Sequence, residues 1–376
     1  MQQYVDRLCD EIRASHHAAQ KIGASLSRAV DTIYFGGGTP SLLSGRQFQQ
    51  IFEHLRAGFD LAADAEITLE CAPGQLADET LAELLRQGMN RISFGVQSFV
   101  DRETAAVGRL HTQRQCEEEL ARVRAAGVDE INIDLIAGLP HQTAQSWLYS
   151  VEQAIASGAP HISVYLLEVD DESRLGREML EKGSRYSASA VPSEDEAAAW
   201  YQQACAALGV AGVPQYEISN FARPGHRSRH NLKYWQRTPY IGFGLDAHSM
   251  LTAGDGAVRF ANTSDLDRYL GNAVTAAPFG MLEATPHAVA SEVDIIGRDE
   301  AFEESLFLGL RLNEGVDLSR LRGQFGDAMV HDAMPALLEV RDAGLLELNF
   351  DRMRLTEHGR LVSNEVFSRL LIHSAA

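Results

Sequence analysis

Apolar, strand-like runs recur along the first half of the chain, and amphipathic stretches separate them. The runs begin 25 to 39 residues apart, which is the length of one strand–helix unit. We interpret them as nearly continuous in apolar residues, a pattern typical of parallel strands that are covered on both faces. The runs are "DTIYFGGG" (31–38), "EITLEC" (66–71), "RISFGVQ" (91–97), "EINIDLIAGLP" (130–140) and "HISVYLLEV" (161–169).

The segments between these runs predict helices. "SGRQFQQIFEHLRAGF" opens with Ser44 and, three residues later, Gln47, which is a capping-box signature. "ADETLAELLRQGMN" has an acidic first turn and a glycine near its end. Repeated strand–helix units form either an open doubly wound sheet or a closed or partial (β/α) barrel.

The residues at the strand ends distinguish these two folds. Every strand ends in a polar or glycine position, and these are Gly36–Gly38, Glu70, Gln97, Asp134 and Glu168. In a barrel such positions converge on one mouth, whereas in an open sheet they spread along an edge. For Asp134 alone the plain alternative is a cap, but a buried carboxylate needs a partner. The series therefore favours a barrel.

The three glycines after the first run have two readings. Glycine lets a backbone approach a ligand closely, so a binding turn is one of them. No Lys follows the glycines and the G-x-G-x-x-G spacing is absent, so neither common phosphate-binding motif applies. A tight turn without a ligand is the other reading, and the motif alone leaves both open.

The last third of the chain has a different character. Residues 213–250 are rich in aromatics, arginines and histidines, and residues 251–285 look loop-rich. "GLLELNFDRMRLT" then predicts two short strands that follow a helix. We therefore expect a domain over 1–285 and a helical, winged-helix-like domain over 286–376. Its acidic helices favour packing or docking over binding DNA.

Composition narrows the class of protein. The formal net charge of the 376-residue chain is −19, which argues against a nucleic-acid partner. The N-terminus lacks the apolar region of a signal peptide, and no apolar run is long enough to span a membrane, so we expect a cytoplasmic protein. A peripheral membrane contact and the oligomeric state stay open.

The four cysteines show no metal-binding spacing and are expected to be isolated thiols.

Seven motifs together resemble a family. They are "YFGGGTPSLL", "EITLECAPG", "RISFGVQSF", "GRLH", "NIDLIAGLP", "ISVYLLE" and "GFGLDAHS". In this order they are similar to the radical SAM proteins related to oxygen-independent coproporphyrinogen III oxidase, over nearly the whole chain. The resemblance implies a partial (β/α) barrel of radical SAM type, and it implies that the glycine turn binds the methionine part of S-adenosylmethionine (SAM).

The same resemblance assigns expected roles to individual residues. It implies that Glu70 and Arg109 contact the charged amino-acid part of SAM and that Gln97 and Asp134 hold the ribose hydroxyls. The turn residues and one histidine complete the set: Gly37, Gly38 and Thr39 line the methionine end, and His248 lies near the adenine or the substrate. The usual E-x-N-P-G of the family reads Glu-Cys-Ala-Pro-Gly here, so Ala72 replaces a polar residue at that edge.

This sequence differs from the family's pattern mainly in lacking the iron–sulfur motif. The resemblance implies a 4Fe–4S cluster held by C-x-x-x-C-x-x-C after the first strand, and this sequence begins at the helix that would follow. The first strand and the cluster loop are therefore expected upstream of Met1, in a truncated reading frame. A natural, shortened paralogue is the alternative. The SAM residues that remain favour truncation.

"HNLKYW" (230–235) resembles the H-N-x-x-Y-W motif of the family's heme chaperones, and the oxidases differ there. It implies a heme-binding role for His230, with an acceptor protein as partner. Tyr234 and Trp235 could pack on the porphyrin or belong to an ordinary core, and Arg227, Arg229 or Arg237 could meet the propionates.

These residues are therefore compatible with three functions. The first is a heme chaperone that depends on SAM and the cluster in the intact family. The second is a coproporphyrinogen III oxidase, and the third is a cluster-free, noncatalytic binding protein.

Overall fold

The computed structural model describes residues 1–376 except 170–173, 182, 184, 272–289 and 371–376. The chain divides into two compact units. The first comprises residues 1–32, 43–65 and 229–376, and the second comprises residues 33–42 and 66–228. The expected boundary at residues 285 and 286 stays a prediction.

A six-stranded sheet runs through the chain in the order β1-β2-β3-β4-β5-β6, so β1 and β6 are its edges. The strands are β1 (Ala29–Phe35), β2 (Asp60–Cys71), β3 (Arg91–Gln97), β4 (Glu130–Ala137), β5 (His161–Leu166) and β6 (Asn220–Ala222). Strands β2 to β5 pair in parallel, whereas β6 is antiparallel to β5 and was not predicted. This curled sheet, which forms about half of a barrel, confirms the predicted partial (β/α) barrel.

The prediction that these strands are nearly continuous in apolar residues is wrong. Along β4 the residues alternate: Ile131, Ile133 and Leu135 are buried apolar side chains, while Asn132 and Asp134 point to the opposite face. Register carries the alternation across the sheet, because Ser93, Asn132 and His161 lie opposite one another on neighbouring strands. The sheet therefore has one apolar and one polar face, and most of the polar side chains are buried too.

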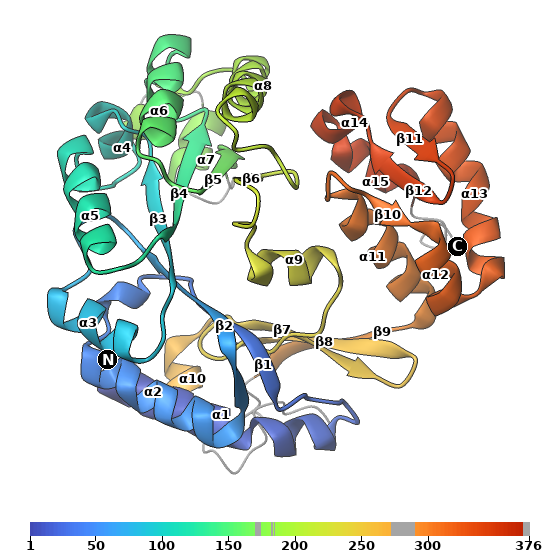
Figure 1. The fold of residues 1–376 in the computed structure, drawn as a ribbon, viewed down its shortest axis with the longest axis horizontal. Coiled ribbons are helices and arrows are strands. Elements are labelled where there is room, and N and C mark those ends of the chain that lie inside the picture. Colours follow the sequence, from blue (N-terminus) through green and yellow to red (C-terminus); the bar gives the residue numbers. More distant parts are fainter. Residues whose placement is uncertain (170–173, 182, 184, 272–289, 371–376) are drawn as a thin grey trace. The chain divides into compact units, whose positions relative to one another are not determined.

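Helices connect the strands of the second unit. They are α3 (Asp78–Arg86), α4 (Asp101–Ala106), α5 (Gln113–Ala125), α6 (Ala144–Ala156), α7 (Arg174–Leu180) and α8 (Glu194–Val210), with short 3-10 turns at η1 (Pro40–Leu42) and η2 (Arg185–Ala190). Helices α6 and α8 pack on β4 and β5 (Figure 1). Trp147 of α6 is fully buried there and donates its indole N–H to the carbonyl of Trp200 on α8 at 2.7 Å.

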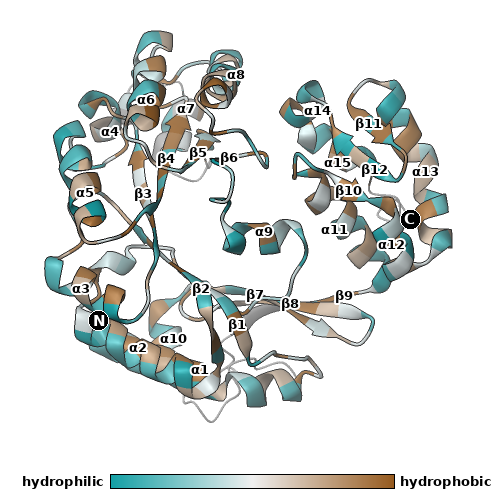
Figure 2. Cartoon of the chain, in the orientation of Figure 1, coloured by the Kyte–Doolittle hydropathy of each residue, from teal (hydrophilic) through white to brown (hydrophobic). Residues whose placement is uncertain are grey.

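The first unit begins with two neighbouring helices, α1 (Gln2–Lys21) and α2 (Gly45–Gly58). Ser44 and Gln47 form the predicted capping box at the start of α2. Both helices are amphipathic and appear as alternating teal and brown bands in Figure 2. The unit also holds α9 (Arg229–Trp235), α10 (Leu266–Gly271) and an antiparallel sheet of β7 (His248–Ala253), β8 (Gly256–Asn262) and β9 (Ala290–Ile296).

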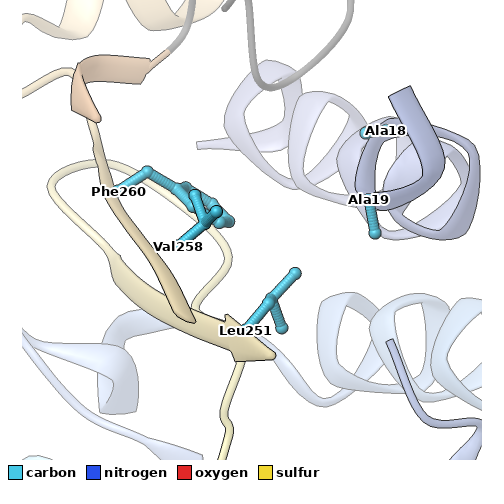
Figure 3. Packing of buried hydrophobic residues seen from close by; sticks show 5 residues of the cluster. All are labelled: Ala18, Ala19, Leu251, Val258 and Phe260. Carbon is cyan, nitrogen blue, oxygen red and sulfur yellow. The ribbon is translucent and has the colours of Figure 1, made fainter. Parts of the chain in front are cut away.

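The sheet β7-β8-β9 corrects the expectation that residues 251–285 are loop-rich. Residues 248–262 form an antiparallel hairpin, and residues 272–285 lie outside the described residues. Figure 3 shows why the hairpin is stable: Leu251, Val258 and Phe260 are buried in one cluster with Ala18 and Ala19 of α1. The Gly254-Asp255-Gly256 turn between two apolar runs was the signal that could have revealed it.

The C-terminal module has the helices and the hairpin that the sequence predicts. It consists of α11 (Arg298–Leu310), α12 (Leu318–Phe325), α13 (Asp327–Asp342), α14 (Glu357–Leu361), α15 (Ser363–Leu370), β10 (Val316–Asp317), β11 (Leu346–Asn349) and β12 (Arg352–Leu355). Strands β11 and β12 pair in an antiparallel hairpin, with β10 on the other side of β12. No helix among the described residues is long and apolar enough to cross a membrane.

Candidate functional site

The glycine turn after β1 is exposed and partly left-handed. Gly37 and Gly38 have φ values of 73° and 58°, and a Cβ at either position would meet nothing within 4 Å. Gly36 differs, since a Cβ there would lie 2.6 Å from the Tyr34 ring and 3.0 Å from the Glu70 carboxylate. The turn therefore needs glycine for backbone conformation at two positions and for close packing at the third, and it leaves open space beside Gly37 and Gly38.

Glu70 ties this turn to β2. Its Oε1 accepts a hydrogen bond from the Tyr34 hydroxyl at 2.5 Å, and its Oε2 accepts one from the backbone N–H of Gly37 at 3.2 Å. Burial and then the neighbouring Glu70 carboxylate raise the pKa of Tyr34, so the phenol remains a donor. The carboxylate is thus held at the edge of the turn, where it can face a cationic group of a ligand.

Gln97 and Arg109 lie together at the end of β3. A Cβ built on Gly95 would approach Gln97 Nε2 to 3.0 Å and Arg109 Nη2 to 3.8 Å, so both side chains lie over this glycine. Gln97 adopts a φ of 68°, in the left-handed region that non-glycine residues rarely occupy. It is buried, and its Oε1 has no hydrogen-bond partner in the described part of the chain. A strained residue with an unsatisfied acceptor indicates a ligand that donates a hydrogen bond there.

Asp134 is the third strand-end group. Its Oδ1 accepts a hydrogen bond from Asn132 Nδ2 at 2.8 Å, and its Oδ2 accepts one from the Ser93 hydroxyl at 3.1 Å. Burial raises the pKa of Asp134 to about 6, although hydrogen bonds from Ser163 and Asn132 oppose the shift. The negative charge of Glu70 adds to the increase. Ionised Asp134 therefore destabilises the folded chain, and such a cost is common where a carboxylate is kept to bind a ligand.

The structure brings most of the predicted residues into the second unit. Register places Glu70 of β2 opposite Ser93 of β3, which lies opposite Asn132 of β4, next to Asp134. The residues of this strand-end site are Gly37, Gly38, Thr39, Glu70, Gln97, Arg109 and Asp134. The turn residues follow β1, Glu70 and Gln97 lie at the ends of β2 and β3, Asp134 lies within β4, and Arg109 follows α4. His248 and His230 belong to the first unit, where His248 is exposed at the start of β7.

The strand-end site fits SAM by its donor set. The open space beside Gly37 and Gly38, the unsatisfied Oε1 of Gln97 and the carboxylate of Asp134 suit a ligand that carries hydroxyl groups. Arg109 supplies a guanidinium for a carboxylate, and Glu70 an acceptor for an ammonium group.

The described residues do not fit an iron–sulfur cluster. Cys9, Cys71 and Cys116 are buried, and burial raises the pKa of Cys9 to about 11 and that of Cys116 to about 12. Burial also raises the pKa of Cys71. Thiols of this kind stay protonated, whereas cluster ligands are thiolates. Within the described ranges no three His, Cys, Asp or Glu side chains gather to hold a metal ion.

His230 is on α9 and both of its ring nitrogens have partners. Nδ1 lies 3.0 Å from the Thr32 hydroxyl, and Nε2 lies 3.0 Å from the hydroxyl of Tyr234, one turn further along the helix. The two rings meet edge to face, with centroids 5.3 Å apart. His226, four residues before His230, bonds Glu130 Oε1 through Nδ1 at 2.7 Å.

The cations around α9 are also paired. Arg229 bonds the carbonyl oxygens of Asp31 and Asp64, and Lys233 forms an ion pair with Asp31 at 2.7 Å. Beyond the helix, Arg237 bonds Glu304 at 2.7 Å. The guanidinium of Arg311 lies 5.1 Å from the ring centroid of Trp235. These contacts fix α9 within the first unit.

Sequence reasoning missed Tyr34, Asn132, His161 and Tyr216. The polar residues at every second position of β4 and β5 were the available signal, because such an alternation marks a polar sheet face.

Substitution of Gly37 by Ala tests the turn. We expect a loss of about 1 kcal/mol of unfolding free energy, because alanine is strained at this positive φ although space is available. Affinity for SAM should fall further, since the new methyl group occupies the open side of the turn. Chemical unfolding and calorimetric titration measure the two effects. Gly23→Ala, at φ 69° and also in open space, is the control, and it should lose stability alone. Equal affinities for wild type and Gly37→Ala would exclude a ligand from this turn.

Comparisons with known proteins agree with the fold. Residues 17–154 match the model of the radical SAM superfamily, and residues 296–362 match the model of the HemN C-terminal domain. The solved coproporphyrinogen III oxidase HemN from Escherichia coli superposes with a TM-score of 0.78 at 23% identity, over 98% of this chain and 82% of the oxidase. This likeness shows a shared fold.

Sequence relatives define the family more narrowly. The heme chaperone HemW of Bacillus subtilis is 33% identical over 91% of this chain and 86% of its own length. HemW of Escherichia coli is 33% identical over 92% and 85% of the two chains. The bovine mitochondrial protein named radical S-adenosyl methionine domain-containing protein 1 is 31% identical over 92% and 76%. The chain therefore belongs to the HemW family of radical SAM proteins.

Proposed function

We propose that this protein is a cytoplasmic heme chaperone: it binds heme, passes it to an acceptor protein, and binds SAM at the strand-end site. The observation that carries the proposal is the similarity to proteins named heme chaperone HemW over about nine-tenths of the chain. The H-N-x-x-Y-W sequence on α9 supports it, because the motif distinguishes heme chaperones from the oxidases.

The proposed SAM contacts follow from the strand-end site. Gly37, Gly38 and Thr39 line the methionine end, while Arg109 binds the carboxylate and Glu70 the ammonium group. Gln97 and Asp134 receive hydrogen bonds from the ribose hydroxyls. For His248 the proposal rests on the family resemblance alone, which implies a role near the adenine or the substrate. When bound, SAM supplies a reactive sulfonium. The cluster that would reduce it has no ligands among the described residues.

The proposed heme contact is His230. If its Nδ1–H donates to the Thr32 hydroxyl, Nε2 carries the lone pair that binds iron. The Tyr234 hydroxyl now occupies Nε2, so heme must displace it. Because the Tyr234 hydroxyl can return to Nε2 when heme leaves, heme binding is reversible. Reversible binding is what a protein that transfers heme to an acceptor requires.

His230→Ala tests the heme site. We expect heme affinity to fall about tenfold or more and the Soret band to shift, because an axial ligand is lost. His226→Ala is the matched control, since it removes a second half-exposed imidazole four residues away that bonds Glu130 instead. Heme titration followed by absorbance gives both quantities. Identical spectra for wild type and His230→Ala would remove this residue from the site.

A coproporphyrinogen turnover assay on the same samples tests the oxidase alternative directly. The proposal predicts heme binding without formation of protoporphyrinogen. Decarboxylation of coproporphyrinogen III at catalytic levels would overturn it in favour of an oxidase. Failure of the folded chain to bind heme would favour the third alternative, a cluster-free, noncatalytic binding protein.

A further inference from the structure

A row of hydrogen bonds leads from Asp134 into the interior of the second unit. Asn132 Nδ2 donates to Asp134 at 2.8 Å, and Asn132 Oδ1 faces His161 Nδ1 at 2.6 Å. His161 Nε2 lies 2.9 Å from the Tyr216 hydroxyl, which accepts a hydrogen bond from the backbone N–H of Ser228 at 3.4 Å. Beyond Asp134, every member is buried. The row thus joins the strand-end site to the last residue of the unit.

The partners fix the direction of each bond. Asn132 Nδ2 also donates to the Ser93 hydroxyl at 2.7 Å, so Asn132 Oδ1 must be the atom that faces His161. The imidazole therefore carries its hydrogen on Nδ1, and Nε2 accepts from the Tyr216 hydroxyl. Burial lowers the pKa of His161 well below its ordinary value, so the ring is neutral and holds a single hydrogen. All donors in this row consequently point toward Asp134.

The same residues can also form these hydrogen bonds with every donor and acceptor exchanged, so that the donors point away from Asp134. An asparagine amide can rotate by half a turn, a neutral imidazole has two tautomers, and a phenol hydroxyl can donate elsewhere. If Asp134 becomes a donor, Asn132 must offer its oxygen, and His161 must then move its hydrogen to Nε2. The Tyr216 oxygen then accepts from His161, and its bond with Ser228 changes. Such a row has two discrete arrangements, which is what coupling between sites requires.

The far end of the row holds the chain just before α9. Besides its backbone bond to Tyr216, Ser228 donates its hydroxyl to Glu66 at 3.3 Å and is almost completely buried. The guanidinium of Arg227 lies 5.4 Å from the centroid of the Tyr216 ring. Tyr216 therefore contacts two consecutive residues, and α9 with His230 follows directly in sequence.

We propose that Asn132, His161 and Tyr216 couple the strand-end site to the H-N-x-x-Y-W segment, so that a nucleoside bound at Asp134 alters heme binding. The inference rests on the proposed function and adds a regulation to it. Ribose hydroxyls that donate to Asp134 keep it an acceptor and strengthen the present direction of the row. SAM should then tighten the hold on Ser228 and change the affinity for heme, and heme should change the affinity for SAM by the same factor.

Tyr216→Phe breaks the row while it keeps the ring that Arg227 contacts. Tyr201→Phe is the matched control, because Tyr201 is a second buried tyrosine of the same unit whose hydroxyl bonds the carbonyl of Ile218, outside the row. We expect saturating SAM to shift the heme dissociation constant of wild type and Tyr201→Phe by about threefold or more. The shift should vanish in Tyr216→Phe, while the affinity for SAM in the absence of heme is kept.

Amide hydrogen exchange of residues 226–236 gives a readout that needs no heme. SAM should slow exchange there about threefold in wild type and Tyr201→Phe but not in Tyr216→Phe. Asp134→Asn makes the same test without any ligand: it replaces one of the two acceptor oxygens by a donor NH2 group. Exchange in this segment should become faster unless Tyr216 is also Phe.

The two readouts separate the possible failures. Absence of SAM or heme binding contradicts the proposed function, and the Asp134→Asn arm then decides the coupling alone. Unchanged exchange of residues 226–236 in Asp134→Asn overturns the coupling. An Asp134→Asn effect that persists undiminished with Phe at position 216 overturns it as well.

Discussion

Asp134→Asn changes stability and binding in opposite directions. The unfolding free energy of the variant minus that of wild type should be about 2 kcal/mol larger at pH 8 than at pH 4. The reason is that the substitution removes a carboxylate whose ionisation destabilises the fold. Its affinity for SAM should fall about 10- to 100-fold, the usual effect of losing a charge-assisted hydrogen bond in a site.

The sign follows from the raised pKa of Asp134, about 6 in the fold against an ordinary value of 3.8. Between these values the unfolded chain ionises readily and the folded one does not, so wild type loses stability as the pH rises through this window. The stability that the group contributes is present below about pH 4 and lost above about pH 6. Asparagine does not titrate, so the loss is absent in the variant.

Urea unfolding at several pH values and calorimetric SAM titration measure the two effects. Asp195→Asn in the exposed first turn of α8 is the control and should change stability by less than about 0.5 kcal/mol at every pH. A stability difference between Asp134→Asn and wild type that does not vary with pH would contradict the argument.

Glu304→Ala is expected to destabilise the first unit severely. The Glu304 carboxylate bonds both Arg237 and Arg259 at 2.7 Å, and the side chains of Glu304 and Arg237 are each only 11% exposed. Removal of the shared anion leaves two cations close together in a poorly hydrated place. Breaking a buried ion pair in this way costs about 3–5 kcal/mol.

Chemical unfolding followed by tryptophan fluorescence measures this loss. Glu365→Ala removes the partner of Arg369 in an exposed pair and should cost less than about 1 kcal/mol. Because Arg237 lies two residues after the end of α9, heme affinity should fall together with stability. Equal unfolding free energies for the two variants would mean that Glu304 is as well hydrated as Glu365.

Local signals in the sequence predicted local features well. Ser44 and Gln47 predicted the start of α2 because the two residues of a capping box are only three positions apart in the sequence. Gln97 and Asp134 were found because the ends of parallel strands share one edge, whatever the details of the turns.

Contacts across the fold could not be read in this way. His161 and Tyr216 are 55 residues apart, and only the antiparallel addition of β6, which no sequence signal marked, brings them together. The partners of His230 show the same limit, since Thr32 is 198 residues away. A motif names the residues that matter, whereas their hydrogen-bond partners depend on tertiary packing.

The two-faced sheet of the second unit separates folding from chemistry. Ile131, Ile133 and Leu135 of β4 belong to the buried apolar layer, while Asn132 and Asp134, at the positions between them, form hydrogen bonds with polar groups of the other face. A substitution on the polar face therefore leaves the apolar layer intact, and one on the apolar face leaves the ligand groups in place. A protein built in this way can acquire a new ligand by single changes at alternate positions, without passing through an unfolded intermediate in its evolution.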